Sequence, residues 1–261
     1  MYNYLKKIVL LIILAHNFTG CNNPTSPEKP EYNYSLLFDL TVNKKHQKLY
    51  IFKTAGKNEY VKTGFPDKKY LILNAVIELT NPNIYFNSFI IDSSIVKNPY
   101  YYKEFFYKNE NDINLKPLTN YILNIKINNK IISGITQPPG NFDIITPYQN
   151  IVINRNTKTK IQWSKSINAY GYIINVSNNY SVIWNDTTHF LNEFFSVTTK
   201  DTSYIFDSSY FHNKGKGEIK IIAFDKNYYN HVIQKIPSAG IKGAYGYFGS
   251  SVMKSVTIKI N

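Results

Sequence analysis

The stretch NYILNIKINNKIISGIT, residues 120 to 136, decides the fold class of this chain. Residues 121–127 place an aliphatic or aromatic side chain at every second position, and residues 131–135 resume the same period after Asn128-Asn129. A period of two predicts β-strands, and Asn tolerates the left-handed backbone that a tight turn requires. The stretch therefore predicts a β-hairpin.

The same pattern continues along most of the chain. Residues 35–53 give two apolar runs around NKKHQK, which predicts another hairpin, and residues 70–83 give a strand that Asn81-Pro82 stops. No helical stripe of useful length appears outside the N-terminus. We therefore predict an all-β fold, in which the second half contributes six short strands within residues 159–166, 169–179, 180–186, 202–209, 217–227 and 255–260.

The N-terminus has the features of an export signal. Lys6 and Lys7 precede an unbroken apolar run, Ile8 to Ala15, which is far shorter than the roughly 20 residues of a membrane-spanning helix. Small residues then precede Cys21, the single cysteine of the chain. This arrangement resembles a bacterial lipoprotein signal, which implies that residues 1–20 are removed and that Cys21 carries the lipid. The alternative is an ordinary secretory signal followed by a chance cysteine.

Residues 21–33 read as an extended tether between the lipid and the folded part. Pro24, Pro27 and Pro30 disfavour both helix and central strand. Asn22 follows the cysteine, whereas the best-known retention signal of the inner membrane has Asp there, so the resemblance implies an outer-membrane lipoprotein.

We place a domain boundary at Pro138-Pro139-Gly140, which gives two β-sandwich domains of immunoglobulin-like type, residues 34–140 and 141–261. In the second, Trp163 followed by Tyr172 and by Ile219-Ile221-Ala223 resembles a fibronectin type III pattern. In the first, LNAVIEL and LKPLTNYILNIKI resemble the small transthyretin-like or carboxypeptidase-regulatory-like sandwich.

The whole chain is similar in plan to lipoproteins of unknown function found with TonB-dependent outer-membrane receptors. Those proteins also end in a Gly-aromatic segment before a last strand, as AGIKGAYGYFGSS does here. The resemblance implies a membrane-anchored partner of an outer-membrane receptor.

Charge and cysteine content exclude several classes of function. The formal net charge is +13, but nearly all of it is scattered Lys, and Arg155 is the sole arginine. Because phosphate recognition favours the bidentate arginine fork, we do not expect nucleic-acid binding. A single cysteine also excludes a disulfide within the chain.

Local signatures of catalysis and of metal binding are missing from the sequence. His46, His189, His212 and His231 are far apart and lack zinc-ligand spacing, and neither a nucleophile elbow nor a phosphate-binding loop occurs. We therefore expect no catalytic residues, no metal site, no cofactor and no enzymatic activity. An exported hydrolase is the weakest alternative, since distant residues can converge in a fold.

Two aromatic segments are candidate binding surfaces. The first is a strand with aromatic side chains on both of its faces. One face can be buried in a core, and the other face is then either packed as well or exposed to solvent. The second is the glycine-rich segment, for which we expect a compact loop that either plugs the sandwich or meets a partner. The candidate residues are Tyr100, Tyr101, Tyr102, Phe105, Phe106 and Tyr107 in the first segment and Tyr245, Tyr247 and Phe248 in the second.

From these features we expect a lipid-anchored, non-catalytic binding or structural protein of the cell envelope that assists an outer-membrane receptor or assembly. The alternative is a carbohydrate-binding or adhesive surface lipoprotein that uses the first aromatic segment as a stacking platform.

Overall fold

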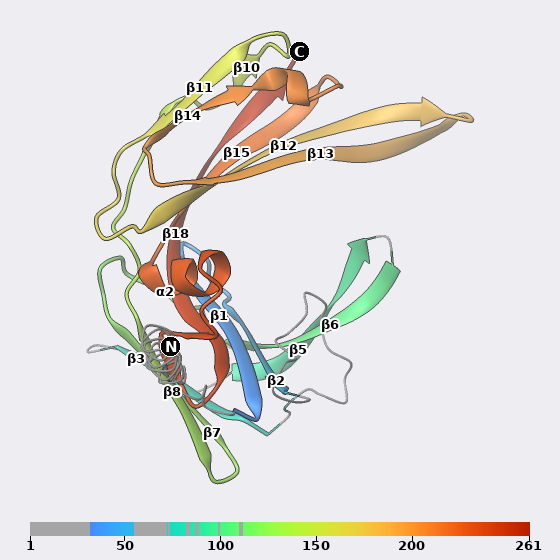
Figure 1. Ribbon diagram of the computed structural model, residues 1–261. Helices are drawn as coiled ribbons and strands as arrows, with labels where there is room; N and C mark the ends of the chain where they lie inside the picture. Colours follow the sequence, from blue (N-terminus) through green and yellow to red (C-terminus); the bar gives the residue numbers. More distant parts are fainter. Residues whose placement is uncertain are drawn as a thin grey trace, which may run out of the picture. The chain divides into compact units, whose positions relative to one another are not determined.

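A computed structural model describes residues 32–54, 72, 74–81, 84–86, 89–98, 100–109 and 112–261, and for residues 84–105 it describes the course of the backbone alone. Residues Tyr32–Asn261 form one compact unit (Figure 1). The signal segment, Cys21 and most of the tether lie outside the described residues. Within the described ranges, no helix is long and apolar enough to cross a bilayer.

The described chain is built almost entirely of β-strands, which confirms the all-β prediction. The first part contains β1 (Tyr34–Val42), β2 (Lys48–Lys53), β3 (Val76–Asn81), β4 (Ile84–Phe86), β5 (Phe89–Asn98), β6 (Tyr100–Asn109), β7 (Tyr121–Ile127) and β8 (Lys130–Thr136). The second part contains β9 (Ile144–Thr146), β10 (Ile151–Ile153), β11 (Lys158–Trp163), β12 (Gly171–Trp184), β13 (Thr187–Thr199), β14 (Ser203–Asp207) and β15 (Gly215–Phe224). It ends with β16 (Ser238–Ala239), β17 (Ile241–Lys242) and β18 (Tyr245–Ile260).

Among the described residues, helical structure is confined to short segments between these strands. They are the 3-10 helix η2 (Ser208–Tyr210), the helix α2 (Lys226–Tyr228) and the π-helix η3 (Tyr229–Ile233). Asp225 caps α2, because its carboxylate accepts a hydrogen bond from the Tyr228 backbone N–H at 2.8 Å.

The strands form one large sheet and two smaller ones. The large sheet has the order β13-β12-β15-β18-β1-β2-β6-β5, with β10 and β16 also paired to β18. The second sheet has the order β17-β8-β7-β3-β4 and the third has the order β14-β11-β9.

Strand β18 connects the two parts of the large sheet. Its first half, residues 245–252, runs parallel to β1, and its second half, residues 251–260, runs antiparallel to β15. A strand from the end of the sequence thus pairs with strands on both sides of the predicted boundary at residue 140.

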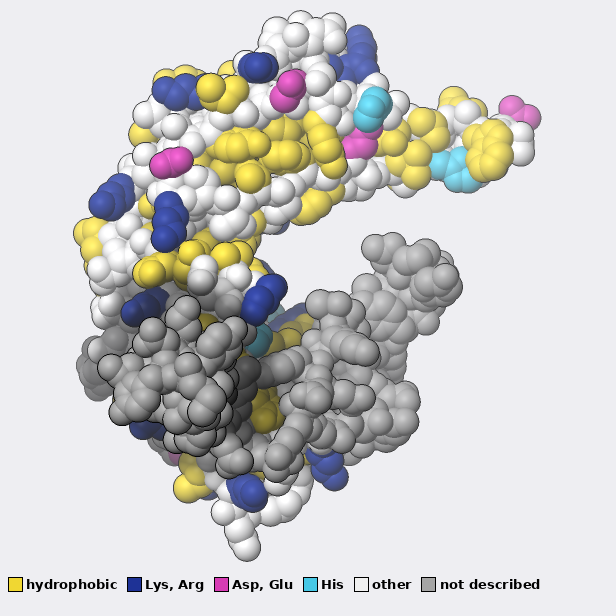
Figure 2. All heavy atoms as spheres, in the orientation of Figure 1, with side chains coloured by type: hydrophobic (Ala, Val, Ile, Leu, Met, Phe, Trp, Pro, Cys, Tyr) yellow, Lys and Arg dark blue, Asp and Glu magenta, His cyan; other side chains and the backbone are white. Residues whose placement is uncertain are grey.

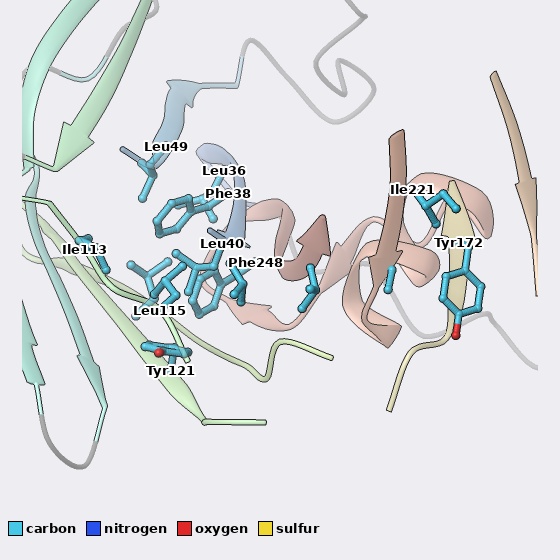
Figure 3. Close-up of a cluster of buried hydrophobic side chains, with 14 of the residues drawn as sticks. Leu36, Phe38, Leu40, Leu49, Ile113, Leu115, Tyr121, Tyr172, Ile221 and Phe248 are labelled. Carbon is cyan, nitrogen blue, oxygen red and sulfur yellow. The ribbon is translucent and has the colours of Figure 1, made fainter. Parts of the chain in front are cut away.

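Buried apolar side chains lie between the large sheet and each smaller sheet. Phe38 and Phe248 from the large sheet stack with ring centroids 5.4 Å apart, close to Tyr121 of the second sheet (Figure 3). On the other side of the molecule, Trp163 of β11 meets Tyr172 of β12 edge to face at 5.3 Å. The sequence had brought Trp163 and Tyr172 together as part of the fibronectin-like pattern, and both are buried.

The structure confirms several local predictions and corrects others. The hairpins within residues 35–53 and 120–136 are present, and β3 ends at Asn81 before the proline. The two strands expected within residues 169–186 are one strand, β12, and β13 was not predicted at all. The expected glycine-rich loop is also wrong, because Tyr245 to Phe248 lie inside β18, which has hydrogen-bonded neighbours on both sides.

Candidate functional site

The aromatic residues of the glycine-rich segment are part of the interior. Phe248 is fully buried and Tyr245 is 7% exposed. Tyr247 is half-buried, and its ring lies 5.1 Å from that of His231 and 5.7 Å from that of Tyr228. Of the two outcomes expected for this segment, the structure shows the one in which its aromatic side chains fill the sandwich, so these residues offer little surface to a partner.

The other aromatic segment is strand β6, and its described side chains are also buried. Phe106 is 3% exposed and lies under the ammonium group of Lys48, which is 4.0 Å from the ring centroid. The Tyr107 hydroxyl donates to the carbonyl of Ile72 at 2.8 Å and accepts from the N–H of Ala75 at 3.1 Å. Neither ring is available as a stacking platform. The remaining candidates, Tyr100, Tyr101, Tyr102 and Phe105, have side chains outside the described residues, as does Cys21.

Strands β12 and β13 form a hairpin that continues past the pairing with β15. β12 pairs with β15 from Gly171 to Asn179, whereas residues 180–184 pair with β13 alone (Figure 1). Residues 180–191 therefore form a two-stranded segment, which we call the ribbon. Its tip is Asn185-Asp186, whose φ angles of 49° and 57° are those of a type I′ turn, which suits the twist of a hairpin.

Large apolar side chains of the ribbon are exposed to solvent. Phe190 is 85% exposed, Ile183 is 79% exposed and Trp184 is 69% exposed. Phe190 and Ile183 lie on one face and Trp184 lies on the other, because side chains alternate along each strand and cross-strand partners share a face. Figure 2 shows these apolar side chains along the ribbon, with an acidic side chain at its tip. Large exposed apolar side chains gathered on one two-stranded segment make the ribbon a candidate interaction surface.

The backbone of β13 is also free to pair on its outer side. In a hairpin with a two-residue turn, the flanking pair Trp184 and Thr187 is hydrogen-bonded, and such pairs recur at every second residue. The N–H and C=O groups between them therefore point away from β12. The Tyr210 hydroxyl supports this assignment, because it donates to the outward carbonyl of Phe194 at 3.2 Å.

No strand pairs with this side of β13 in the part of the chain that the structure describes. We call it the open edge; its outward-facing residues are Thr188, Phe190, Asn192, Phe194, Ser196 and Thr198. Natural edge strands are usually short or carry charges, prolines or bulges that discourage pairing. β13 has 13 residues, no proline and no lysine, and its one carboxylate, Glu193, lies near the base of the ribbon, so the outer part of the open edge lacks these protections.

A hollow adjoins the open edge near the base of the ribbon. It has a volume of about 640 Å³, and its walls are formed by Glu193, Phe194, Asp207, Ser209, Tyr210 and His212. The ring of Tyr210 is held by its hydroxyl bond to β13 and by edge-to-face contacts with Phe195 at 5.3 Å and Phe211 at 5.8 Å. Tyr210 and Phe194 are nevertheless half exposed, so the hollow has two aromatic walls, of which Tyr210 is held in place by these contacts.

Glu193 is fixed in one orientation by neutral donors. One carboxylate oxygen accepts from the backbone N–H of His212 at 3.0 Å and from the Asn213 amide at 3.2 Å, and the other accepts from the Asn178 amide at 2.9 Å. Partial burial opposes ionisation of Glu193, but these hydrogen bonds outweigh it and lower the pKa of the carboxyl group.

Asp207 is the second carboxylate of the hollow. It accepts hydrogen bonds from the Ser209 hydroxyl at 2.7 Å and the Ser209 N–H at 3.1 Å, and these lower its pKa. Within the described residues, no lysine or arginine nitrogen lies within 4.0 Å of either carboxylate, and the nearest basic group is His212 Nδ1, 3.4 Å from Glu193. Lys158 of β11 is the cross-strand partner of Asp207, and its charge also lowers the pKa of that carboxyl group. The printed partners of Glu193, by contrast, are neutral donors and His212.

This local charge is opposite to that of the whole chain. Although the chain has 30 Lys and Arg residues, residues 166–199 and 201–213 contain none, and together they hold Asp186, Glu193, Asp201 and Asp207. Lys200, between these stretches, lies over the rings of Tyr170 and Tyr229 at 5.0 Å and 4.9 Å. The ribbon and the β13 wall of the hollow thus contain no lysine or arginine, whereas Lys158, opposite Asp207, and Arg155, bonded to the His212 carbonyl, adjoin the hollow from other segments.

The histidines and carboxylates do not assemble a metal site in the described ranges, where no three His, Cys, Asp or Glu side chains lie together in a suitable arrangement. His212 and Glu193 are neighbours, but the carboxylate is occupied by amide and backbone donors.

Strand β13 was not predicted because its apolar residues do not alternate. Its sequence TTHFLNEFFSVTT has apolar side chains at the adjacent positions 190 and 191 and again at 194 and 195, so no period of two is apparent. The signal that could have revealed it is Asn185-Asp186, a two-residue turn pair between two β-rich runs.

Comparison with known proteins gives only distant similarity. No protein-family model matches the sequence, and no curated protein matches it. Among solved structures, the chain aligns with the fibronectin(III)-like modules of CbhA from Clostridium thermocellum at 12% identity, over 87% of this chain and 94% of that chain, with a TM-score of 0.26. It also aligns with the IG1 and IG2 domains of DIP-gamma at 8% identity, over 89% and 98% of the two chains, with a TM-score of 0.23. Scores this low carry no argument about function.

Proposed function

We propose that this protein is a lipid-anchored, non-catalytic binding protein of the cell envelope, which holds a partner protein by accepting an extended segment of it along the open edge of β13. The observation that carries the proposal is a 13-residue edge strand whose outward side pairs with no other described strand and whose ribbon exposes Phe190, Ile183 and Trp184. Strand addition to such an edge gives affinity through backbone hydrogen bonds and specificity through alternate side chains.

The anchoring part of the proposal is supported by the sequence pattern that ends at Cys21. An outer-membrane receptor or assembly is the partner class favoured by the resemblance of the whole chain to lipoproteins found with TonB-dependent receptors. Replacement Cys21→Ser should abolish incorporation of a clickable palmitate analogue and should release the protein from the membrane fraction. Retention of the label in the variant would contradict lipidation at this residue.

The binding part is tested with a photo-crosslinking amino acid in place of Phe190 in the full-length protein on intact cells. We expect a defined crosslinked partner that mass spectrometry identifies. In combination with Thr188→Pro, the crosslink should be lost, because proline removes an outward N–H of the open edge. The thermal unfolding temperature of Thr188→Pro should stay close to that of the wild type, because this N–H makes no bond within the hairpin.

Two controls separate the open edge from general surface chemistry. In an affinity pull-down that uses no crosslinking residue, Phe190→Lys should abolish the partner capture seen with the wild-type chain, whereas Ile131→Lys, at an exposed residue of the β7–β8 hairpin, should leave capture intact. Capture that survives both Thr188→Pro and Phe190→Lys would overturn strand addition at β13.

A further inference from the structure

The hollow beside the open edge contains two ionised carboxylates, and these favour a positively charged ligand. Both of its carboxylates have pKa values below the ordinary range, so both are ionised at neutral pH. Among the described residues, no lysine or arginine nitrogen lies within 4.0 Å of either carboxylate. Lys158, the cross-strand partner of Asp207, acts on that carboxylate from a greater distance. Arg155 lies nearby but binds main-chain carbonyl groups, those of His212 and Asn261.

The aromatic walls of the hollow also favour a cation. The half-exposed rings of Tyr210 and Phe194 border the two carboxylates. A cation next to an aromatic face is attracted by the ring quadrupole, and this attraction is strongest for a weakly hydrated, planar group such as guanidinium. A hollow with two anionic groups and two aromatic rings is thus complementary to an organic cation.

The position of the hollow connects it with the open edge. Glu193 and Phe194 are consecutive residues of β13, and the Tyr210 hydroxyl is bonded to an outward carbonyl of the same edge. A segment added along β13 beside the ribbon would end its pairing here, because the Phe194 carbonyl is bonded to Tyr210, and a side chain near its end would face the hollow.

From these observations we infer that the segment bound at the open edge is basic, and that the hollow formed by Glu193, Asp207 and Tyr210 receives one of its arginine or lysine side chains. This inference rests on the proposed function and names the chemistry of the partner. The composition of residues 166–213 supports a basic partner segment. Apart from the histidines, the only basic side chain in this stretch is that of Lys200, which is directed to Tyr170 and Tyr229.

The test uses NMR titration of the ¹⁵N-labelled chain with small probes of known charge. N-acetyl-arginine amide should give saturable shifts of the Ser209 and His212 amide signals, whereas the neutral N-acetyl-glutamine amide should not. Added salt should weaken the arginine response, since an exposed ionic contact is screened.

Variants locate the site. Asp207→Asn should weaken arginine binding by roughly tenfold, because one ionic hydrogen bond is lost while the amide can still cap η2. Tyr210→Leu should weaken it by a smaller factor. The matched controls are Asp201→Asn and Tyr148→Leu, which change an exposed aspartate and a 75% exposed tyrosine elsewhere and should leave binding unchanged.

Equal responses to the arginine and glutamine probes, or no effect of Asp207→Asn, would overturn the inference. A response to a neutral oligosaccharide such as maltotriose without a response to arginine would assign the hollow to a glycan instead. Either result leaves strand addition standing if the Phe190 crosslink is still lost in Thr188→Pro, so the two proposals fail separately.

Discussion

The first residues of β18 and the ribbon are both rich in aromatic side chains, yet they have opposite environments. Tyr245 and Phe248 are buried, whereas Phe190 and Trp184 are among the most exposed apolar residues of the described chain. β18 has β1 on one side and β16 on the other, and its Phe248 faces β8 across the core. The ribbon has only its own two strands. The number of neighbouring elements decides exposure, and aromatic content does not.

Glycine explains how β18 reaches its buried position. Gly246 has a φ of +101°, and a Cβ atom there would lie 1.9 Å from the carbonyl oxygen of Leu36 in the paired strand. Only glycine allows the two backbones this approach. The glycines of this segment therefore serve close packing, where the sequence alone had suggested a loop.

The largest expected contrast between the two regions is in stability. Phe248→Ala should lower the free energy of unfolding by about 4 kcal/mol, because it removes a fully buried ring and leaves a cavity. Phe190→Ala should change it by less than about 0.5 kcal/mol, because the ring is already in water. Urea denaturation measures both, and similar losses in the two variants would refute the contrast.

The next contrast concerns a carboxylate of the interior beside β18. The Asp39 Oδ2 atom accepts from the Ser251 hydroxyl at 2.9 Å and from that of Thr41 at 3.3 Å, while its Oδ1 atom is buried without a partner. Burial raises the pKa of Asp39 from 3.8 to about 6. The folded state therefore binds this proton more tightly than the unfolded state, and the resulting stability is present below pH 3.8 and lost as the pH rises through about 6.

Asp39→Asn should remove this dependence and should be more stable than the wild type at neutral pH by about 3 kcal/mol. The measurement is the free energy of unfolding of both proteins at a series of pH values. Asp186→Asn, at the exposed tip of the ribbon, is the control and should follow the wild-type curve. If the free energies of unfolding of Asp39→Asn and of the wild type differed by the same amount at every pH in the series, a raised pKa of Asp39 in the folded state would be contradicted.

Glu193, at the base of the ribbon, should show the reverse dependence. Its pKa is below 4.5 because neutral donors bind the ionised form, so its contribution is present above pH 4.5 and lost as the pH falls through the lower folded-state value. Glu193→Gln should cost about 1 kcal/mol at neutral pH and less in acid. Thermal unfolding of both proteins at neutral pH and at acidic pH measures this cost. A cost that grows toward low pH would contradict the prediction.

The smallest effect on stability is expected from changing the apolar surface of the ribbon. Ile183→Lys combined with Phe190→Lys should alter the free energy of unfolding by less than about 0.5 kcal/mol, because both side chains are exposed. The same change should reduce binding of an apolar fluorescent dye. Ile131→Lys should reduce it less, and a marked loss of stability in the double variant would show that the ribbon packs against something in the folded chain.

Local sequence patterns predicted those elements whose turn and alternating residues lie within one short stretch of the sequence. The hairpin of β7 and β8 follows from alternating residues around Asn128-Asn129, and the end of β3 follows from Pro82, which cannot donate to a sheet. Even there the buried face of β8 is that of Ile132, while Ile131 and Ile135 are exposed. A period of two identifies two faces but does not say which of them meets another sheet.

The candidate site was much less accessible to prediction. The signal before Cys21 and the all-β class are properties of short windows, and the sequence by itself determined both expectations. The course of β18 between β1 and β15, the open edge of β13 and the meeting of Glu193 with Asp207 and Tyr210 were decided only by the tertiary structure. The physical reason is that burial, free backbone groups and uncompensated charge depend on which distant strands become neighbours, and no local pattern records that choice.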